Sequence, residues 1–249
     1  MSAEEWIAGL HAVRTALEQA PGRISGLWLD RTRKDQRLHA IVEQATAARV
    51  HIQWVDRREL DRLAPGARHQ GALCRVRAAE TRSEAYLEQL LTRRAQPFLL
   101  ILDGVQDPHN LGACLRSADA AGVDAVVVPR DRACGLNATV RKVASGAAES
   151  VPLVQVTNLA RTLRMLQHAG LQLVGADGAA QESLYETDLR GPLGLVLGAE
   201  GKGMRRLTRE HCDRLLQIPM VGVVESLNVS VAAGICLFEA VRQRGSTPD

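Results

Sequence analysis

Two loops of small and polar residues in the last quarter of the chain have residue types suited to ligand binding. One reads Gly-Ala-Glu-Gly-Lys-Gly-Met over residues 198–204 and follows an apolar run at 193–197; the other covers 221–230 and follows 215–218. Open α/β sheets bind ligands in loops at the carboxyl ends of their strands, and glycine permits a close backbone approach. Two such loops together would form a pocket walled by backbone groups. The alternative is two ordinary turns, with Asn228 as a helix N-cap.

A third loop of interest reads Asp-Gly-Val-Gln-Asp-Pro-His-Asn over residues 103–110 and leads into a predicted helix. The chain has no Gly-x-Gly-x-x-Gly loop and no Gly-x-x-x-x-Gly-Lys-Ser/Thr loop, which disfavours a nicotinamide enzyme and a P-loop kinase. Asn110 is a candidate N-cap of that helix. Arg116 either forms salt bridges on the helix surface or places a guanidinium at a pocket mouth, where it could hold a phosphate. His109 is interpreted as a structural hydrogen-bonding residue rather than a general base.

Strands and helices alternate from residue 97 onward, which predicts an α/β domain with a parallel sheet covered on both faces. The predicted strands cover 98–102, 125–128, 151–156, 171–175, 193–197 and 215–218. The predicted helices cover 110–121, 138–145, 158–169, 205–211 and 229–243. The last helix is apolar on nearly all sides between Val231 and Phe238, which predicts burial on more than one side, by the domain itself or by a second subunit.

A smaller α/β domain is predicted over residues 1–77, followed by a polar linker at 78–96 and the larger domain at 97–249. Its predicted helices cover 5–19, 36–48 and 57–63, and its predicted strands cover 24–29, 50–55 and 71–76. Two basic segments of this domain, 30–34 and 68–71, could either meet an anion or be solvated turns.

The charge distribution and the cysteine content limit the classes of protein to which this chain can belong. Residues 1–96 contain 16 Lys and Arg against 12 Asp and Glu, whereas residues 97–249 contain 15 against 16; this mild basic excess is weak evidence for a nucleic-acid partner. Five scattered cysteines without a Cys-x-x-Cys pair disfavour zinc and disulfides and fit a reducing cytosol. The chain has no apolar run long enough to span a membrane and no secretory signal at its start, so we expect a cytoplasmic protein without a membrane partner.

Three separated segments, 102–118, 195–204 and 218–232, together resemble the SpoU (TrmH-type) RNA ribose 2′-O-methyltransferases. The likeness covers residues 97–244. The N-terminal domain, with Gly-Leu-His-Ala-Val at 9–13, resembles the L30e/L7Ae-like RNA-binding domain that some of these enzymes carry.

The resemblance implies a SPOUT-type deep trefoil knot, formed by the chain from about Leu215 onward under the 198–204 loop, and a homodimer. It also implies S-adenosylmethionine as cofactor, and we expect no metal site. The implied cofactor-binding residues are Leu197, Gly198, Gly203, Ile218, Pro219, Met220, Ser226 and Leu227.

The activity implied by the resemblance is methylation of the ribose 2′-hydroxyl of a guanosine in large-subunit (23S) rRNA, in the peptidyl-transferase P-loop. The implied catalytic residues are Asn110, Arg116, Glu200 and Asn228. Arginine stays protonated, so Arg116 is expected to act as an electrostatic clamp, although a role as base stays open. Glu225 departs from the family pattern and adds a negative charge beside the pocket. The alternatives are methylation of tRNA and a non-catalytic RNA-binding protein of ribosome assembly.

Overall fold

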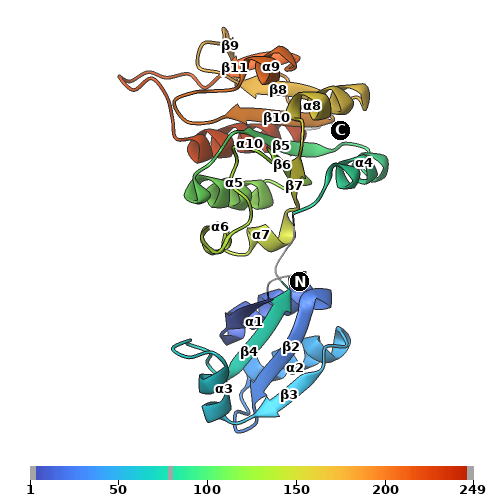
Figure 1. Ribbon diagram of the computed structural model, residues 1–249, viewed down its shortest axis with the longest axis vertical. Coiled ribbons are helices and arrows are strands. Elements are labelled where there is room, and N and C mark those ends of the chain that lie inside the picture. The colour runs from blue at the N-terminus through green and yellow to red at the C-terminus, as the bar shows by residue number, and fades with distance from the viewer. Residues whose placement is uncertain (1–3, 78–80, 246–249) are drawn as a thin grey trace. The chain divides into compact units, whose positions relative to one another are not determined.

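The computed structural model describes residues 4–77 and 81–245, and the chain divides into two compact units, residues 1–80 and 81–249 (Figure 1). The sequence placed a linker at 78–96, whereas the second unit begins at Thr81. Helix α4 (Glu84–Arg93) lies in that segment and buries Leu87 and Leu90 in the core of the second unit. Among the described helices, none combines the length and apolar content needed to cross a membrane.

The first unit is a four-stranded mixed sheet with the strand order β1-β4-β2-β3. Its strands are β1 (Glu4–Ala8), β2 (Ile24–Asp30), β3 (Ile52–Val55) and β4 (Ala72–Arg77). Its helices are α1 (Leu10–Gln19), the 3-10 turn η1 (Pro21–Arg23), α2 (Gln36–Ala47) and α3 (Arg57–Leu63). Leu27 and Leu29 of β2 are buried with α1 and α2, whereas the intervening Trp28 is buried with Leu60 of α3. This alternation is that of a strand covered on both faces.

The helix expected over residues 5–19 is wrong in its first part. Residues Glu4–Ala8 form β1, which pairs antiparallel with β4, and the helix begins only at Leu10. Gly9 separates the two elements with φ of 104°, a conformation that glycine adopts without strain. Ile7 and Leu10 have the spacing of one helix face, but they belong to two different elements. Pairing with β4 is what makes residues 4–8 a strand.

The second unit is a seven-stranded parallel sheet with the order β7-β6-β5-β10-β8-β11-β9. Its strands are β5 (Phe98–Asp103), β6 (Ala125–Pro129), β7 (Leu153–Val156), β8 (Gln172–Ala176), β9 (Glu182–Ser183), β10 (Leu193–Gly198) and β11 (Arg214–Gln217). Besides α4, its helices are α5 (Pro108–Ala120), α6 (Ala138–Ala144), α7 (Ala147–Ser150), α8 (Leu159–His168), α9 (Arg206–Glu210) and α10 (Val229–Gly245). The predicted parallel α/β sheet is confirmed; β9 and α7 were not predicted.

Each face of this sheet has its own apolar core. Leu100 and Leu102 of β5 are buried with residues of α5, α6 and α10, whereas Leu99 and Ile101 are buried with residues of α4 and α8. Successive side chains of a strand point to opposite faces, so the continuous apolar run at 98–102 supplies both cores. Helices on both faces explain why these strands show no polar alternation.

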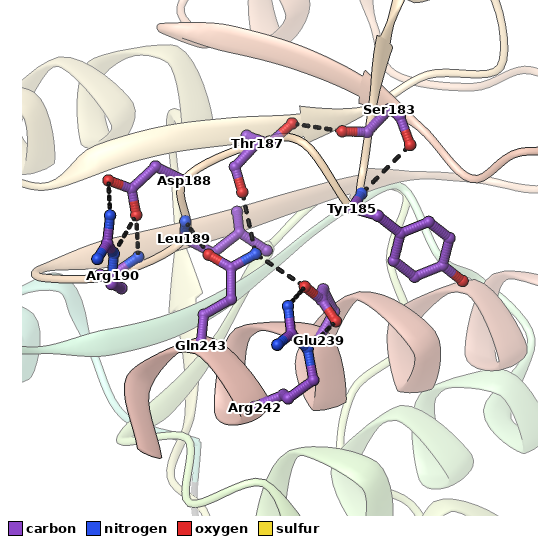
Figure 2. A network of polar contacts seen from close by, with 9 residues as sticks. All are labelled: Ser183, Tyr185, Thr187, Asp188, Leu189, Arg190, Glu239, Arg242 and Gln243. Carbon is purple, nitrogen blue, oxygen red and sulfur yellow. Dashed lines mark hydrogen bonds and ion pairs between the residues drawn. The ribbon is translucent and has the colours of Figure 1, made fainter. Parts of the chain in front are cut away.

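The C-terminal half of α10 is tied to the chain that follows β9 (Figure 2). The Gln243 Oε1 atom accepts from the Leu189 backbone N–H at 2.9 Å, and its Nε2 donates to the Thr187 carbonyl at 3.0 Å and to Glu239 at 2.8 Å. The Arg242 guanidinium donates two hydrogen bonds to the buried Glu239. Burial opposes ionisation of Glu239, but the hydrogen bonds from Arg242 and Gln243 lower the pKa of its carboxyl group. The trefoil knot stays a prediction.

Candidate active site

Side chains from two loops and from the first turn of α5 meet beside the ends of β5 and β10. These strands are parallel neighbours, with Gly198 in register with Asp103. Asn110 lies in the first turn of α5, Glu200 follows β10, and Asn228 directly precedes α10. All three polar residues come from segments singled out in the sequence, and the parallel topology brings them to one edge of the sheet.

Asn110, Glu200 and Asn228 form a closed ring of hydrogen bonds. Asn228 Nδ2 donates to Glu200 Oε1 at 2.6 Å and to Asn110 Oδ1 at 2.9 Å, and Asn110 Nδ2 donates to Glu200 Oε2 at 3.3 Å. Both oxygens of the carboxylate therefore accept an amide hydrogen. Charge-assisted hydrogen bonds are among the stronger ones in proteins, so the ring fixes the start of α5 and the two loops relative to one another.

Asn228 fulfils both interpretations that the sequence left open. Its Oδ1 accepts from the Ser230 backbone N–H at 2.9 Å and from the Ser230 hydroxyl at 2.6 Å, which caps the start of α10. Its Nδ2 is thereby turned toward Glu200 and Asn110. The cap thus orients the amide that completes the ring.

Asn110, by contrast, is not the N-cap of α5. That position is taken by Asp107, whose carboxylate accepts from the His109 backbone N–H at 3.0 Å. Pro108 occupies the first turn, where its missing N–H costs nothing. The cap three residues earlier leaves the buried Asn110 amide free to join the ring.

The glycine loop is held by its backbone and by one ion pair. A Cβ atom on Gly198 would lie 2.0 Å from the Gly203 carbonyl carbon and 2.1 Å from the Met204 nitrogen, so only glycine fits there. The buried Asp103 carboxylate accepts from the Arg205 backbone N–H at 2.8 Å and from its Nε at 2.6 Å. Asp103 and Arg205 were not assigned a role from sequence, although Asp103 ends an otherwise apolar strand.

A cavity of about 410 Å³ opens between the glycine loop and the chain that follows β11. Of the eight expected cofactor-binding residues, seven line it: Leu197, Gly198, Gly203, Ile218, Met220, Ser226 and Leu227. Pro219 is exposed and lies outside the lining. Asp177, Glu200 and Glu225 add three carboxylates to the wall, so Glu225 faces the cavity rather than only solvent.

A second cavity of about 310 Å³ adjoins the first, because Ala199, Glu200, Gly203 and Val229 line both. Its wall also holds Asn110 and three basic residues, Arg132, Lys202 and Arg205. Arg132 has φ of 59°, a left-handed conformation that is uncommon outside glycine. The first cavity is lined by carboxylates without a basic residue, whereas the second holds both cations and the carboxylates of Asp103 and Asp107, with Asp103 paired to Arg205.

Arg116 is exposed on α5 and lines neither cavity. It follows Asn110 by six residues, which places it about 9 Å further along the helix and about 240° around its axis. The structure therefore brings three of the four expected catalytic residues together and leaves Arg116 apart from them.

The cysteines are unsuited to nucleophilic chemistry. Burial raises the pKa of the Cys74, Cys114, Cys212 and Cys236 thiols to about 12, which keeps them protonated at neutral pH. Within residues 4–77 and 81–245, His, Cys, Asp and Glu form no group of three that could hold a metal ion.

Comparison with known proteins gives matches along nearly the whole chain. Residues 97–238 match the SpoU rRNA Methylase family, and residues 6–82 match the RNA 2′-O ribose methyltransferase substrate binding family. The chain is 57% identical over 246 residues to the 23S rRNA (guanosine-2′-O-)-methyltransferase RlmB of Shewanella oneidensis, covering 99% of this chain and all of the relative. It is 58% identical to RlmB of Escherichia coli strain K12, covering 96% and 99% of the two chains.

Among solved structures, the SpoU methyltransferase AviRb from Streptomyces viridochromogenes, in complex with the cofactor AdoMet, superposes with a TM-score of 0.73. It is 25% identical, and the match covers 98% of this chain and 92% of AviRb. The glycine loop, the hydrogen-bonded ring and the parallel sheet thus occur in a chain that belongs to the SpoU rRNA methylase family.

Proposed function

We propose that this protein transfers a methyl group from S-adenosylmethionine to the ribose 2′-hydroxyl of a guanosine in 23S rRNA. The observation that carries the proposal is the Asn110–Glu200–Asn228 ring, which joins three matched segments and includes Glu200, a residue that lines both cavities. The two RlmB relatives that are 57% and 58% identical are 23S rRNA (guanosine-2′-O-)-methyltransferases, which supports the same reaction. We further propose that the guanosine lies in the peptidyl-transferase P-loop and that the enzyme acts in the cytoplasm, where its substrate is made.

The first cavity fits S-adenosylmethionine in size and in chemistry. Its volume of about 410 Å³ lies within the range of small-molecule sites. Leu197, Ile218 and Leu227 supply apolar walls suited to an adenine ring, and backbone groups beside Gly198 supply donors and acceptors. The carboxylate of Glu225 suits a ligand with a sulfonium and an ammonium group, whereas Asp177 is paired with Arg209 at 2.9 Å. When bound, this cofactor supplies an electrophilic methyl group.

The second cavity suits the ribose and phosphate of the target nucleotide. Arg132 and Lys202 offer positive charge to a phosphate, and Asn110 and Glu200 offer polar atoms to a sugar hydroxyl. The reaction is a displacement in line, so alignment accounts for most of the catalysis. Because its two oxygens are held by amides, Glu200 is suited to positioning the loops and the hydroxyl at the junction of the two cavities.

We propose that the protein is a homodimer formed through α5 and α10. Val231 and Phe238, seven residues apart, share one face of α10 and are 49% and 51% exposed. The opposite side of α10 packs on α5 and β10. Arg116 is exposed on α5 and lies outside both cavities of its own chain, so a role as clamp on the RNA requires a second subunit or the RNA itself to meet it. A monomeric mass by light scattering at micromolar concentration would contradict the dimer.

The proposed function is tested by incubating the protein with labelled S-adenosylmethionine and unmodified large-subunit rRNA, followed by nuclease mapping of the label. We expect label on the ribose of one P-loop guanosine and its loss in Arg116→Ala. Label on tRNA instead would keep the chemistry and overturn the substrate. Absence of transfer to any RNA, with cofactor still bound, would favour a non-catalytic RNA-binding protein.

A further inference from the structure

The first unit contains a cavity of about 590 Å³ that the reaction above does not use. It lies between the loop after β2, the first turns of α2 and the edge strand β3. Its wall includes Arg31, Arg33, Lys34, His39 and Trp54. We propose that this cavity binds an unpaired nucleotide of the RNA substrate, with its base stacked on Trp54 and its phosphates beside Arg31 and Lys34. The proposal rests on the proposed function only for the identity of the RNA.

Trp54 differs from the other two tryptophans in its exposure. Trp28 is 8% exposed, and Trp6 packs against it with ring centroids 4.9 Å apart and the ring planes tilted by 50°. Trp54 is 48% exposed and lies on β3, which pairs with β2 and ends the strand order of the described sheet. An indole with an open face is a platform on which any base can stack.

The loop that carries the cations is held in place by its own hydrogen bonds. Thr32 donates to the Asp30 carboxylate from its backbone at 2.9 Å and from its hydroxyl at 2.7 Å. The Arg33 guanidinium donates to the Asp35 carboxylate and to the Gln70 carbonyl. Arg33 therefore joins the two basic segments noted in the sequence and fixes the loop, so its role is structural.

Arg31 and Lys34 differ from Arg33 because their charges are available to a ligand. The Arg31 guanidinium lies 3.8 Å from Asp56, but both side chains are more than half exposed, so this ion pair is weak. Lys34 is exposed and forms no ion pair within 4 Å with any residue of the described chain. Two available cations on a fixed loop beside an open indole match the phosphates and the base of a single strand.

The expected ligand is an unpaired nucleotide rather than a nucleotide in a duplex. A base in a duplex has no free face for Trp54, whereas an unpaired base can turn out and stack on an aromatic side chain. Phosphate contacts by Arg31 and Lys34 add affinity without reading sequence. The cavity would therefore hold a loop nucleotide of the substrate and contribute affinity rather than base identity.

The test measures equilibrium binding of unmodified 23S rRNA to the full-length protein without cofactor. We expect Trp54→Ala to weaken binding about tenfold and Trp54→Phe, which keeps a stacking face, to restore most of it. Lys34→Gln should weaken binding and lower the slope of log affinity against log salt by about one. Tyr185→Ala, an exposed aromatic of the second unit, and Arg62→Gln, an exposed cation outside the cavity, are matched controls. Thermal unfolding of each variant reports on folding.

Equal binding by wild type and Trp54→Ala would overturn the subsite, as would equal competition by single-stranded oligouridylate and by its duplex with oligoadenylate. Because cofactor is absent, the result does not depend on methyl transfer. An inactive protein with Trp54-dependent RNA binding would uphold the subsite and overturn the proposed function. An active enzyme with Trp54-independent binding would do the reverse.

Discussion

The cavity at the strand ends of the second unit and the cavity beside Trp54 in the first differ in what holds their polar groups. Asn110, Glu200 and Asn228 satisfy one another, and the loop that carries Glu200 is fixed by the backbone contact at Gly198. Trp54 and Lys34, on the other hand, face solvent. Fixed groups suit the alignment of reacting atoms, whereas open groups suit binding of a large ligand. Substitutions should therefore affect rate in one region and affinity in the other.

The largest effect is expected for Gly198→Ala. The added methyl group would overlap the Gly203 and Met204 backbone, and overpacking of this kind costs about 1–3 kcal/mol. The glycine loop would be displaced, and cofactor binding measured by calorimetry should be lost together with methyl transfer. Gly222→Ala is the matched control, since a Cβ there meets no atom within 4 Å. Unchanged cofactor affinity in Gly198→Ala would show that the loop is not held as described.

A large effect limited to catalysis is expected for Asn228→Asp. Aspartate caps a helix as well as asparagine, so α10 keeps its start. The new carboxylate would replace a donor that lies 2.6 Å from Glu200 Oε1, and two like charges at that distance repel. We expect the single-turnover rate to fall by about 100-fold, the range of a lost charge-assisted hydrogen bond, with RNA affinity within twofold, roughly the scatter of such measurements.

The control for this change is Asn158→Asp, at the N-cap of α8, where the side chain accepts from the Arg161 backbone N–H. This substitution should leave the rate unchanged, because Asn158 is not part of the Asn110–Glu200–Asn228 ring. If Asn228→Asp and Asn158→Asp changed the rate equally, helix capping alone would explain the effect of changing Asn228. The ring would then have no role in catalysis.

The smallest effect is expected at Glu239 of α10, which is hydrogen-bonded to Arg242 and Gln243 and lines neither cavity. Hydrogen bonds from Arg242 and Gln243 lower the pKa of Glu239. A lowered folded-state pKa contributes stability that is present above the unfolded pKa of about 4.3 and is lost as pH falls through the folded pKa. Glu239→Gln should lower the free energy of unfolding at pH 7 by about 1 kcal/mol and flatten its acid dependence. An unchanged acid profile in urea unfolding would contradict this role.

The sequence predicts the elements of the second unit better than those of the first. The strand at 193–198 and the helix that begins at Val229 are long, apolar and bounded by loops, so their patterns have one interpretation. Residues 5–8 were predicted as helix because an apolar spacing continued across Gly9, whereas the structure pairs them with the distant β4 as part of strand β1. Long-range strand pairing is not encoded in local spacing.

The site residues likewise divide into those that local sequence predicts and those that only the tertiary fold places. Glu200 and Asn228 stand in loops whose composition predicts a pocket, and the family resemblance nominates them as site residues. The cap at Asp107 could be read from its position before Pro108, but that Asn110 then reaches Glu200 depends on the register of β5 and β10. Arg132 comes from a segment without a motif, so its place in the second cavity follows from the fold alone.

The most direct test of this account compares Glu200→Gln with Trp54→Ala in one single-turnover experiment on unmodified 23S rRNA. Rate constant and RNA dissociation constant are measured together over a range of RNA concentrations. For Glu200→Gln we predict a lower rate constant at saturating RNA and an unchanged RNA dissociation constant. For Trp54→Ala we predict a higher RNA dissociation constant and an unchanged rate constant at saturating RNA. Both variants losing rate and affinity in parallel would contradict the separation of alignment from binding.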